Sequence, residues 1–487
     1  MNKLISENPR NSAIFAIPKD VALRHQCIGL LWNEGVLHVG IRQSLDESEV
    51  RDLHQEVVLY VDSEIKFQQI DDAKLLSLID NSYSHISYSK EDVRDEKIRV
   101  TEGTVTEIVN DIIKRSINFR ASDIHIEPTE NELNVRIRVD GKLEDLARIE
   151  GNTAAPIISR LKVMAKMNIV ERRRPQDGQI TFETDGRVID LRLATVNTIY
   201  GEKIVIRVLD SSRVVDDVES LGISKGDLKT FHNIVDNHFG LVVVAGPTGS
   251  GKTTTLHSAI RYLNSTELNI TTLEDPVEYV VSGVNHVPVD ESIGAGFAMQ
   301  LRAILRQDPD VVLVGETRDT ETARIAIQGA LSGRLVLTSL HAPDALGVIY
   351  RLFQMDIEPH LVAAAVNGII AQRLVRRICD YCKYEYLPSA HEKIALQLGK
   401  DSLQKLAKGS GCTFCRGTGY FDRVGVFQLL EITENLREII STRPNPRQLA
   451  LEAEKTQMKT LAHSARELVV TQQTTFEEIS FLMNSEE

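Results

Sequence analysis

Apolar residues recur along this chain with two different periods, and the changes of period divide it into parts. Within residues 105–113 they fall at positions 105, 108, 109, 112 and 113, which is the spacing of one face of a helix. Within residues 133–139 they occupy every second position, and an Asp140-Gly141 turn follows, which is typical of a hairpin. Further strands are expected at residues 187–193 and 203–209. These patterns predict an α+β domain.

A different pattern begins near residue 240 and continues to about residue 375. We expect short buried strands at residues 241–245, 270–273, 311–314 and 335–339, with helices between them. Strands that alternate with helices in this way are typical of a parallel α/β sheet. Beyond the cysteines that follow this region, the chain is expected to be mostly helical.

The first 80 residues predict a small mixed domain. Short aliphatic runs at residues 28–32 and 36–41 predict a hairpin, and residues 45–59 and 71–78 predict helices. The part contains no catalytic combination of residues, so we interpret it as a docking module. Residues 80–97 are rich in Ser, Asp, Lys and Tyr without apolar periodicity and predict a linker.

The length and charge of the chain restrict what kind of protein it can be. Its 487 residues are too many for one hydrophobic core, and its net charge of −13 disfavours binding to nucleic acid. The basic clusters at residues 172–174 and at Arg373, Arg376 and Arg377 are short, and a solvated or salt-bridged face explains them. No apolar run approaches the roughly 20 residues of a membrane span, and residues 1–10 lack the apolar core of a signal peptide. We therefore expect a cytoplasmic protein that reaches a membrane through partners.

A glycine-rich segment follows the strand expected at residues 241–245 and fits the pattern GxxxxGK[ST] at every position. Its glycines let successive backbone N–H groups point at phosphate oxygens, and the helix that begins near Lys252 adds its positive end. Lys252 can reach the β and γ phosphates, and the Thr253 hydroxyl can hold Mg²⁺. The segment predicts an ATP site formed by Gly246, Pro247, Thr248, Gly249, Ser250, Gly251, Lys252 and Thr253.

Hydrolysis also needs a carboxylate near the metal and a group that orients the attacking water. Glu316 follows the expected strand at residues 311–314, and Glu274 begins an acidic cluster after the strand at residues 270–273. His341 follows the segment at residues 337–340 in the same way. Strand ends carry the ligand sites of α/β folds, but a surface turn explains an acidic cluster equally well, and a lone histidine is usually structural.

Four of the five cysteines form two CxxC pairs, Cys379 with Cys382 and Cys412 with Cys415, separated by 29 residues. Four thiolates complete a tetrahedral Zn²⁺ shell and leave no open position, so the predicted zinc site is structural. Disulfides are disfavoured in a reducing cytoplasm, and redox chemistry usually needs only one pair. Cys27 stands alone among aliphatic residues and is expected to be buried without chemistry.

Four segments together resemble the Walker A, Asp, Walker B and His boxes of the type II secretion and type IV pilus ATPase superfamily, the general secretory pathway protein E family. They are GPTGSGKTTTL, TLEDPVEY, LRAILRQDPDVVLVGETRD and LTSLHAPDA. The segments ASDIHIEP and RIRVDG and the paired CxxC fit the same family, and the resemblance covers about residues 100–430.

The resemblance implies functional roles for individual residues. Glu274 and Glu316 would be the catalytic carboxylates, with the choice of base left open, and His341 would sense the γ-phosphate. Arginines of the preceding domain and of the core would approach the nucleotide, although a surface ion pair explains any single arginine as well. These arginines are Arg192, Arg207, Arg302, Arg306 and Arg423.

The expected fold class is α/β, with a RecA-like P-loop core, a preceding α+β domain, a small N-terminal docking domain, a tetracysteine zinc lobe and a helical C-terminus. In chain order, the expected parts are docking domain 1–80, linker 81–98, PAS-like α+β domain 99–212, ATPase core 213–375, zinc lobe 376–425 and C-terminal helical domain 426–487.

The resemblance implies a homohexameric ATPase that energises pseudopilus assembly for type II protein secretion, recruited peripherally to the inner membrane. Its expected partners are the cytoplasmic domain of an inner-membrane secretion protein, bound through residues 1–80, and an inner-membrane platform protein. A short N-terminal region favours secretion over type IV pilus assembly, and a retraction motor generally lacks both the docking domain and the four cysteines. A DNA-translocating ATPase is disfavoured by the acidic charge, and a non-catalytic nucleotide-gated scaffold predicts no turnover.

Overall fold

The computed structural model divides the chain into two compact units. The first unit comprises Met1–Asp210, Ile378–Tyr384 and Lys408–Asp422, and the second comprises Ser211–Arg377, Glu385–Ala407 and Arg423–Glu487. The structure describes residues 13–14, 16–17, 19–33, 36–58, 60–61, 63–83, 104–184, 186–210, 217–290, 294–399, 402–412 and 414–483.

The N-terminal part of the first unit contains a three-stranded sheet and three described helices. The hairpin predicted from the sequence is confirmed, because β1 (Cys27–Asn33) pairs antiparallel with β2 (Val36–Arg42). Both predicted helices are confirmed as α3 (Glu47–Val58) and α4 (Asp72–Tyr83), and α2 (Lys19–His25) precedes them.

The third strand, β3 (Ile65–Ile70), pairs parallel with β2 and was not predicted. Its sequence IKFQQI is polar at three of six positions, so the aliphatic signal of an ordinary strand is weak. Helix α4 extends to Tyr83, and residues 84–98 of the expected linker lie outside the described residues.

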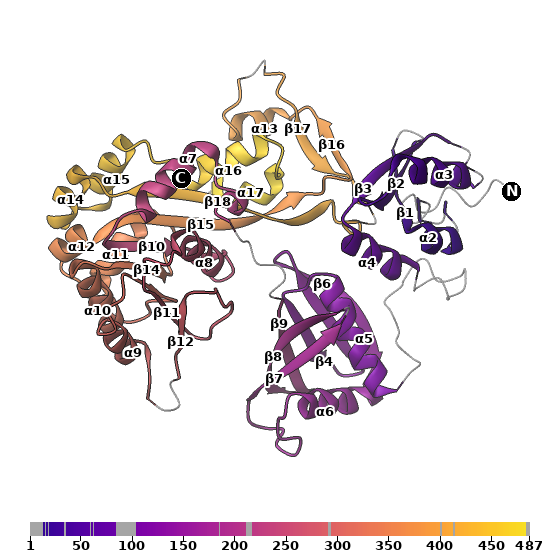
Figure 1. Ribbon diagram of the computed structural model, residues 1–487, viewed down its shortest axis with the longest axis horizontal. Helices are drawn as coiled ribbons and strands as arrows, with labels where there is room; N and C mark the ends of the chain where they lie inside the picture. The colour runs from indigo at the N-terminus through magenta and orange to yellow at the C-terminus, as the bar shows by residue number, and fades with distance from the viewer. Residues whose placement is uncertain are drawn as a thin grey trace. The chain divides into compact units, whose positions relative to one another are not determined.

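The rest of the first unit is mainly an antiparallel sheet of six strands in the order β6-β5-β4-β9-β8-β7 (Figure 1). Its helices α5 and α6 pack on one face, against the apolar residues of the strands. The α+β domain predicted from the two periods is therefore present. Its elements are α5 (Val105–Asn118), β4 (Asp123–Pro128), β5 (Glu132–Val139), β6 (Lys142–Glu150), α6 (Ala154–Met164), β7 (Gln176–Thr184), β8 (Arg187–Thr198) and β9 (Gly201–Leu209).

The opposite face of this sheet is charged. Because side chains alternate along a strand, the buried residues of β5 leave Arg136 on the other face, beside Glu127 of β4 and Lys203 of β9. Glu127 lies 2.8 Å from the Arg136 guanidinium and 2.7 Å from Lys203 Nζ. Burial alone would raise the pKa of Glu127, but hydrogen bonds from Arg136 and Lys203 outweigh it and the pKa is lowered.

The second unit is a three-layer α/β structure around a seven-stranded sheet in the order β12-β11-β13-β14-β10-β15-β18. The neighbours from β12 to β15 all pair parallel, as the alternation of strands and helices predicted. Its strands are β10 (Gly240–Ala245), β11 (Ile270–Glu274), β12 (Asn285–Pro288), β13 (Val311–Val314), β14 (Leu335–Leu340), β15 (Val366–Ile378) and β18 (Tyr420–Glu431).

Two apolar layers cover the two faces of this sheet. Leu241, Val243 and Ala245 of β10 contribute to one layer, and Val242 and Val244 contribute to the other. Some helices of the unit cover the two faces of the sheet, and the others form the C-terminal part of the chain (Figure 1). They are α7 (Lys225–Val235), α8 (Lys252–Leu263), α9 (Phe297–Ile304), α10 (Thr320–Leu331), α11 (Ala345–Gln354), α12 (Pro359–Ala365), α13 (Ala390–Ala395), α14 (Glu434–Ser441), α15 (Pro446–Lys455), α16 (Leu461–Val470) and α17 (Phe476–Met483). A separate two-stranded sheet joins β16 (Lys383–Tyr386) and β17 (Leu406–Gly409).

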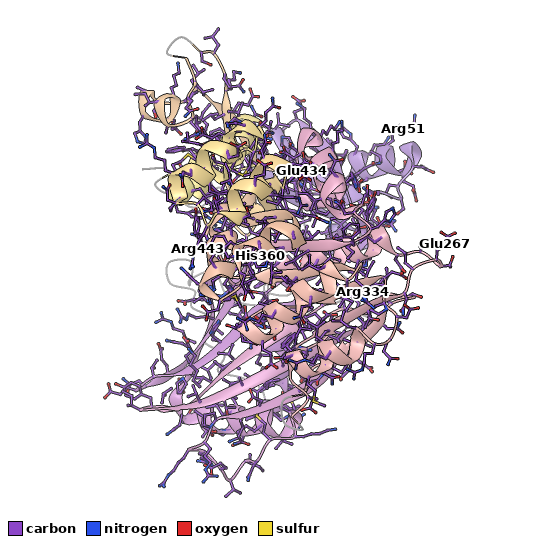
Figure 2. The ribbon with its side chains drawn as sticks, turned by 90° about the vertical axis from the view of Figure 1, so that its left-hand side faces the viewer. Arg51, Glu267, Arg334, His360, Glu434 and Arg443 are labelled. Carbon is purple, nitrogen blue, oxygen red and sulfur yellow. The ribbon has the colours of Figure 1, made fainter. Side chains whose placement is uncertain are left out.

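Residues of both basic clusters noted in the sequence form hydrogen bonds with acidic side chains. Arg376 donates to Glu478 at 2.6 Å, and the Glu171 carboxylate accepts the backbone N–H groups of Arg173 and Arg174. Figure 2 labels charged side chains of both signs on the second unit, among them Glu267, Arg334, Glu434 and Arg443. None of the helices in the described ranges combines the length and the apolar character needed to cross a bilayer.

Candidate active site

The glycine-rich loop joins the end of β10 to the start of α8, as the sequence predicted. Gly246 has a φ of +155°, and a Cβ there would lie 2.4 Å from Ser250 Oγ and 2.6 Å from the backbone oxygen of Gln372. Gly251, at φ +88°, immediately precedes α8 and faces the Gln372 amide. Only glycine fits this close approach of two backbones, and the loop therefore wraps tightly onto the N-terminus of α8.

Lys252 bends back over the loop. Its Nζ donates to the backbone oxygens of Gly246 and Pro247, both at 3.0 Å. Burial lowers the pKa of Lys252, whereas the negative charge of Glu316 acts in the opposite direction. The ammonium group is thus partly desolvated at the mouth of the loop, where an anionic oxygen would bind strongly.

Two hydroxyls of this segment are buried. Ser250 Oγ and Thr255 Oγ1 are buried, and neither has a hydrogen-bond partner among the described residues. The Gln372 side chain holds the loop from β15 by donating to the Ser250 backbone oxygen at 2.6 Å. A glycine-rich loop, a partly desolvated lysine and the N-terminus of the following helix fit a nucleotide phosphate chain.

The parallel sheet brings His341 beside the loop. Ala245 of β10 is the register partner of Leu340 of β14, and the Gly246 N–H donates to the Leu340 oxygen at 3.3 Å. His341 follows Leu340 directly and is exposed. Its place at this strand end agrees with the prediction from the sequence.

Glu316 leaves the same edge of the sheet from β13, the other neighbour of β14. Its segment is fixed to the end of β14, because Ser339 Oγ donates to the Gly315 oxygen at 2.8 Å and Thr317 N–H donates to the Ser339 oxygen at 3.0 Å. The Glu316 carboxylate forms an ion pair with the exposed Arg318 guanidinium. Glu316 therefore lies at the carboxyl edge, within electrostatic reach of Lys252.

Glu274 is the last residue of β11 and is only 3% exposed. His257 Nε2 lies 2.8 Å from its Oε2, and His286 Nδ1 lies 3.2 Å from its Oε1. Burial by itself raises the pKa of Glu274, but hydrogen bonds from His257, Thr272 and His286 outweigh burial, so the pKa is lowered. An ionised carboxylate is thus held at the strand end that the sequence predicted.

The five arginines predicted to approach the nucleotide lie in different surroundings. Arg302 of α9 forms an exposed ion pair with Glu321 at 2.7 Å, which matches the alternative of a surface pair. Arg306 and Arg423 are exposed residues of the second unit. Arg192 and Arg207 belong to the first unit, where they are register partners on β8 and β9.

The four paired cysteines converge on one point. Their Sγ atoms all lie within 4.8 Å of one another, and all four residues are buried. Sγ–Sγ distances of 3.8 Å for Cys379–Cys412 and for Cys382–Cys415 are too long for a disulfide. They match the edge of about 3.8 Å of a tetrahedron with metal–sulfur distances of about 2.3 Å.

Backbone N–H groups complete the surroundings of these sulfurs. Gly411 N–H donates to Cys382 Sγ at 3.3 Å, and Gly419 N–H donates to Cys415 Sγ at 3.2 Å. Hydrogen bonds among the four cysteines lower the pKa of Cys382 and of Cys415 and raise the pKa of Cys379 and of Cys412. The donors and the distances fit a metal held by four thiolates.

The cysteine-bearing segment is attached to the α+β domain by two reciprocal cation–π contacts within the first unit. The Arg120 guanidinium lies 3.7 Å from the centre of the Phe421 ring, and the Arg416 guanidinium lies 4.6 Å from the centre of the Phe119 ring. Arg416 also pairs with Glu144 at 3.0 Å. The α+β domain and the cysteine-bearing segment thus each supply one guanidinium group and one aromatic ring to the contact.

Four charged residues at this attachment have a left-handed backbone. Asp140 adopts it in the turn between β5 and β6, and Arg120 adopts it directly after the C-cap of α5. The residues with positive φ are Arg120 (60°), Asp140 (48°), Arg416 (53°) and Asp422 (71°).

Comparison with known proteins identifies the family of the chain. A family model described as "Type II/IV secretion system protein" matches residues 99–481. The chain belongs to this family. The resemblance seen in the four sequence boxes is thereby confirmed.

Curated relatives of this type II/IV secretion system family member include secretion and pilus proteins. It is 40% identical over 393 residues to "Type II secretion system protein E" of Xanthomonas campestris pv. campestris, which covers 80% of this chain and 69% of that protein. It is 41% identical over 339 residues to "Type II secretion system ATPase E" of Vibrio cholerae, covering 70% and 67%. It is 40% identical over 402 residues to "Type IV pilus assembly ATPase PilB" of Myxococcus xanthus, covering 81% and 71%.

Solved structures agree with the predicted fold class. The X-ray structure of the Legionella pneumophila ATPase DotB matches with a TM-score of 0.58 at 18% identity, covering 80% of this chain and 98% of that one. The pilus retraction motor PilT with bound ADP matches with a TM-score of 0.51 at 25% identity, covering 76% and 95%. This family member is an ATPase with a P-loop α/β core.

Two residues at the site of this ATPase were missed by the sequence analysis. His257 lies inside α8 and His286 lies in the edge strand β12, so neither marks the end of a core strand as His341 does. Their shared partner Glu274 is 17 and 12 residues away along the chain, respectively. The histidine side chains thus come together only through the parallel pairing of β11 with β12 and the packing of α8.

The crowding at Gly246 makes a prediction about the loop. Gly246→Ala would place a methyl group against the fixed Gln372 backbone, displace the loop and weaken nucleotide binding at least about tenfold, equal to about 1.4 kcal/mol. The measurement is a titration with a fluorescent ATP analogue. Gly333→Ala is the matched control, because Gly333 has a φ of +97° but nothing within 4 Å of a Cβ. Equal affinity of the Gly246→Ala and natural proteins would contradict the prediction.

Proposed function

We propose that this ATPase binds ATP with Mg²⁺ at residues 246–253 and hydrolyses it as a cytoplasmic homohexamer that energises pseudopilus assembly for type II secretion. The observation that supports the catalytic part is the common edge of the parallel strands. Strand β11 ends in Glu274, Glu316 follows β13 by two residues, His341 follows β14 directly, and β14 pairs with the strand that enters the loop. Three polar groups and a phosphate loop at one edge suit phosphoryl transfer to water.

Each group at this edge has a distinct role in the proposal. Loop N–H groups and Lys252 would bind the phosphates, and the Thr253 hydroxyl would hold Mg²⁺, which would supply positive charge to balance the negative charge that develops during phosphoryl transfer. Glu274 and Glu316 are the catalytic carboxylates that orient and activate water. His341, exposed beside Gly246, contacts the γ-phosphate.

Arg192 and Arg207 are proposed to stabilise charge on the transferred phosphoryl group. They lie directly opposite each other on β8 and β9, where two like charges destabilise a sheet. Asp123, 3.5 Å from Arg207, balances part of this charge. The positive charge of Arg192 and Arg207 that Asp123 does not balance is suited to an anionic ligand. Arg302, Arg306 and Arg423 are proposed as further nucleotide contacts, and for Arg302 the contact requires release from Glu321.

Recruitment to the inner membrane is proposed to occur through the N-terminal part, residues 1–80. A secretion-system membrane protein would bind this part by its cytoplasmic domain, and an inner-membrane platform protein would be a second partner. The small fold of helices α2 to α4 around β1 to β3 supports a docking role, because its apolar core, which also includes the four paired cysteines, is separate from the two apolar layers of the P-loop sheet. No nucleic acid is expected, given the net charge of −13.

Type IV pilus assembly is the second candidate function. PilB of Myxococcus xanthus is as similar to this chain as protein E of Xanthomonas campestris, at 40% identity each.

We further propose that Cys379, Cys382, Cys412 and Cys415 bind a structural Zn²⁺. The matching Sγ distances support this site, and four protein ligands leave no position for substrate. The metal would fix the segment that carries Arg416 and Phe421, and thereby the cation–π attachment to the α+β domain.

The catalytic proposal predicts that Glu316→Gln lowers ATP turnover at least about 100-fold while ATP still binds, because the carboxylate acts on water rather than on the bound phosphates. Phosphate release and binding of a fluorescent ATP analogue separate the two effects. Glu267→Gln, an exposed substitution in the same unit, should leave both unchanged. Turnover that survives in Glu316→Gln would reject the assigned role, and DNA-stimulated turnover of the natural protein would favour a DNA translocase.

The docking proposal predicts which membrane proteins are captured from detergent-solubilised inner membranes. The full chain should retain a secretion-system membrane protein, and a chain that lacks residues 1–80 should lose it, because those residues form the binding surface. Mass spectrometry identifies the captured protein. Recovery of only a pilus platform protein would favour the second candidate function, and equal capture by both chains would refute docking through residues 1–80.

The zinc proposal predicts that the purified chain carries one Zn²⁺ and that Cys412→Ser removes it, because three remaining thiolates bind the ion much more weakly. Metal content measured by mass spectrometry tests this directly. Cys27→Ser is the control, since burial raises the pKa of the Cys27 thiol to about 12 and keeps it protonated. Full zinc content in Cys412→Ser would show that the metal does not require this ligand.

A further inference from the structure

The carboxylate of Glu274 lies between two imidazole rings that come from opposite sides. His257 projects from α8 and His286 from β12, and their rings are parallel within 4° with centroids 6.3 Å apart. His257 is 1% exposed, and the His286 side chain is 8% exposed. Each ring contacts a different oxygen of the carboxylate.

The hydrogen bonds of His286 determine its tautomer. Its Nε2 lies 3.0 Å from the backbone N of Val281, whose N–H can only donate, so Nε2 is the acceptor. The proton of the neutral ring is therefore on Nδ1, which faces Thr272 Oγ1 at 2.8 Å and Glu274 Oε1 at 3.2 Å. His286 thus presents a donor to this end of the carboxylate and is itself fixed by the backbone.

His257 supplies the donor on the other side. Its Nε2 lies 2.8 Å from Glu274 Oε2, and an ionised carboxylate only accepts, so Nε2 carries a proton. The Tyr279 ring packs edge-on against the imidazole at a centroid distance of 5.7 Å. His257 lies on the helix that starts with Lys252, five residues further along. The carboxylate is thus tied to the helix that begins at the phosphate loop.

This arrangement leaves the carboxylate able to act on water. A carboxylate has about four acceptor positions on its two oxygens, and the two imidazoles and the Thr272 hydroxyl account for at most three. At least one position remains for a further donor. The two rings prevent rotation of the carboxylate plane, which sets the direction of that remaining acceptor.

We propose that His257 and His286 are positioning residues that hold the Glu274 carboxylate in one orientation and in its ionised form, so that it accepts a hydrogen bond from the attacking water. This inference rests on the proposed catalytic role of Glu274. The lowered pKa of Glu274, despite its burial, agrees with the geometry. Three donors weaken the basicity of Glu274, which suits this carboxylate to orienting the water.

The test is steady-state ATP hydrolysis by the full chain with substitutions at the two histidines. His257→Phe keeps the ring volume but removes the donor, and kcat should fall about 10- to 100-fold with KM for ATP changed less than about twofold. His257→Gln returns an N–H group near the position of Nε2 and should recover at least a third of the natural kcat. His286→Leu should lower kcat in the same way, and His286→Asn, whose amide replaces Nδ1–H, should recover it.

Matched controls separate positioning from damage to the fold. His232→Phe makes the same exchange at a histidine of the same unit that packs against Tyr262 and Phe231 instead of Glu274, and it should leave kcat unchanged. Binding of a fluorescent ADP analogue shows that each variant retains a folded nucleotide site. If His257→Phe does not bind the analogue, the His286→Leu and His286→Asn pair decides the question.

Glu274→Gln distinguishes the failure of this inference from the failure of the proposed function. If Glu274→Gln abolishes turnover while His257→Phe and His286→Leu retain natural kcat, the positioning inference is wrong and the catalytic role of Glu274 stands. If Glu274→Gln retains turnover, both are wrong. A loss of kcat that the Gln and Asn substitutions do not restore would show that the rings matter only for packing.

Discussion

The parallel pairing of β10 with β14 is the interaction on which the catalytic geometry depends. Its register places the end of β10 beside Leu340, so the chain leaves the sheet into the glycine loop at the level where His341 leaves from β14. The next pairings, of β14 with β13 and of β13 with β11, bring Glu316 and Glu274 to the same edge. Because every strand between β11 and β10 points in the same direction, groups far apart along the chain emerge at one edge of the sheet.

Burial of charge at this edge is compensated locally. Glu274 is almost fully buried, and an unpaired carboxylate there would be costly or protonated. Two histidines and a threonine hydroxyl supply the donors that keep it ionised. Lys252 is likewise partly desolvated. Among the described residues, the backbone oxygens of Gly246 and Pro247 and the carboxylate of Glu316 compensate its charge. The site therefore combines one satisfied anion with one under-compensated cation, which favours binding of a polyphosphate over a neutral ligand.

The cysteine-bearing segment shows how a small lobe can be coupled to a larger domain. Its four sulfurs form a compact centre, while Arg416 and Phe421, only a few residues away, contact Glu144, Phe119 and Arg120 of the α+β domain. Planar guanidinium groups stacked on aromatic rings add attraction without requiring a large apolar interface. Ion pairs of Arg120 with Asp140 at 3.0 Å and with Asp422 at 3.8 Å add to the same contact.

The sequence by itself determined the local elements and the chemistry of the loop and of the cysteines. Helix α5, the hairpin of β5 and β6 and the core strands follow from periodicity, because burial on one face or on both leaves a direct pattern in the residues. The loop at Gly246–Thr253 needs glycines and a lysine at fixed spacing whatever surrounds it. Strand β3 was not predicted because three polar residues interrupt its apolar pattern.

Only the tertiary structure decided which separate residues share one site. The convergence of His257 and His286 on Glu274 depends on the packing of α8 and on the pairing of β11 with β12, and neither leaves a spacing rule in the chain. The surface pair of Arg302 with Glu321 and the register pair of Arg192 with Arg207 were equally invisible. The reason is physical: local sequence specifies local backbone geometry, whereas hydrogen bonds between distant side chains exist only once the sheet has aligned its strands.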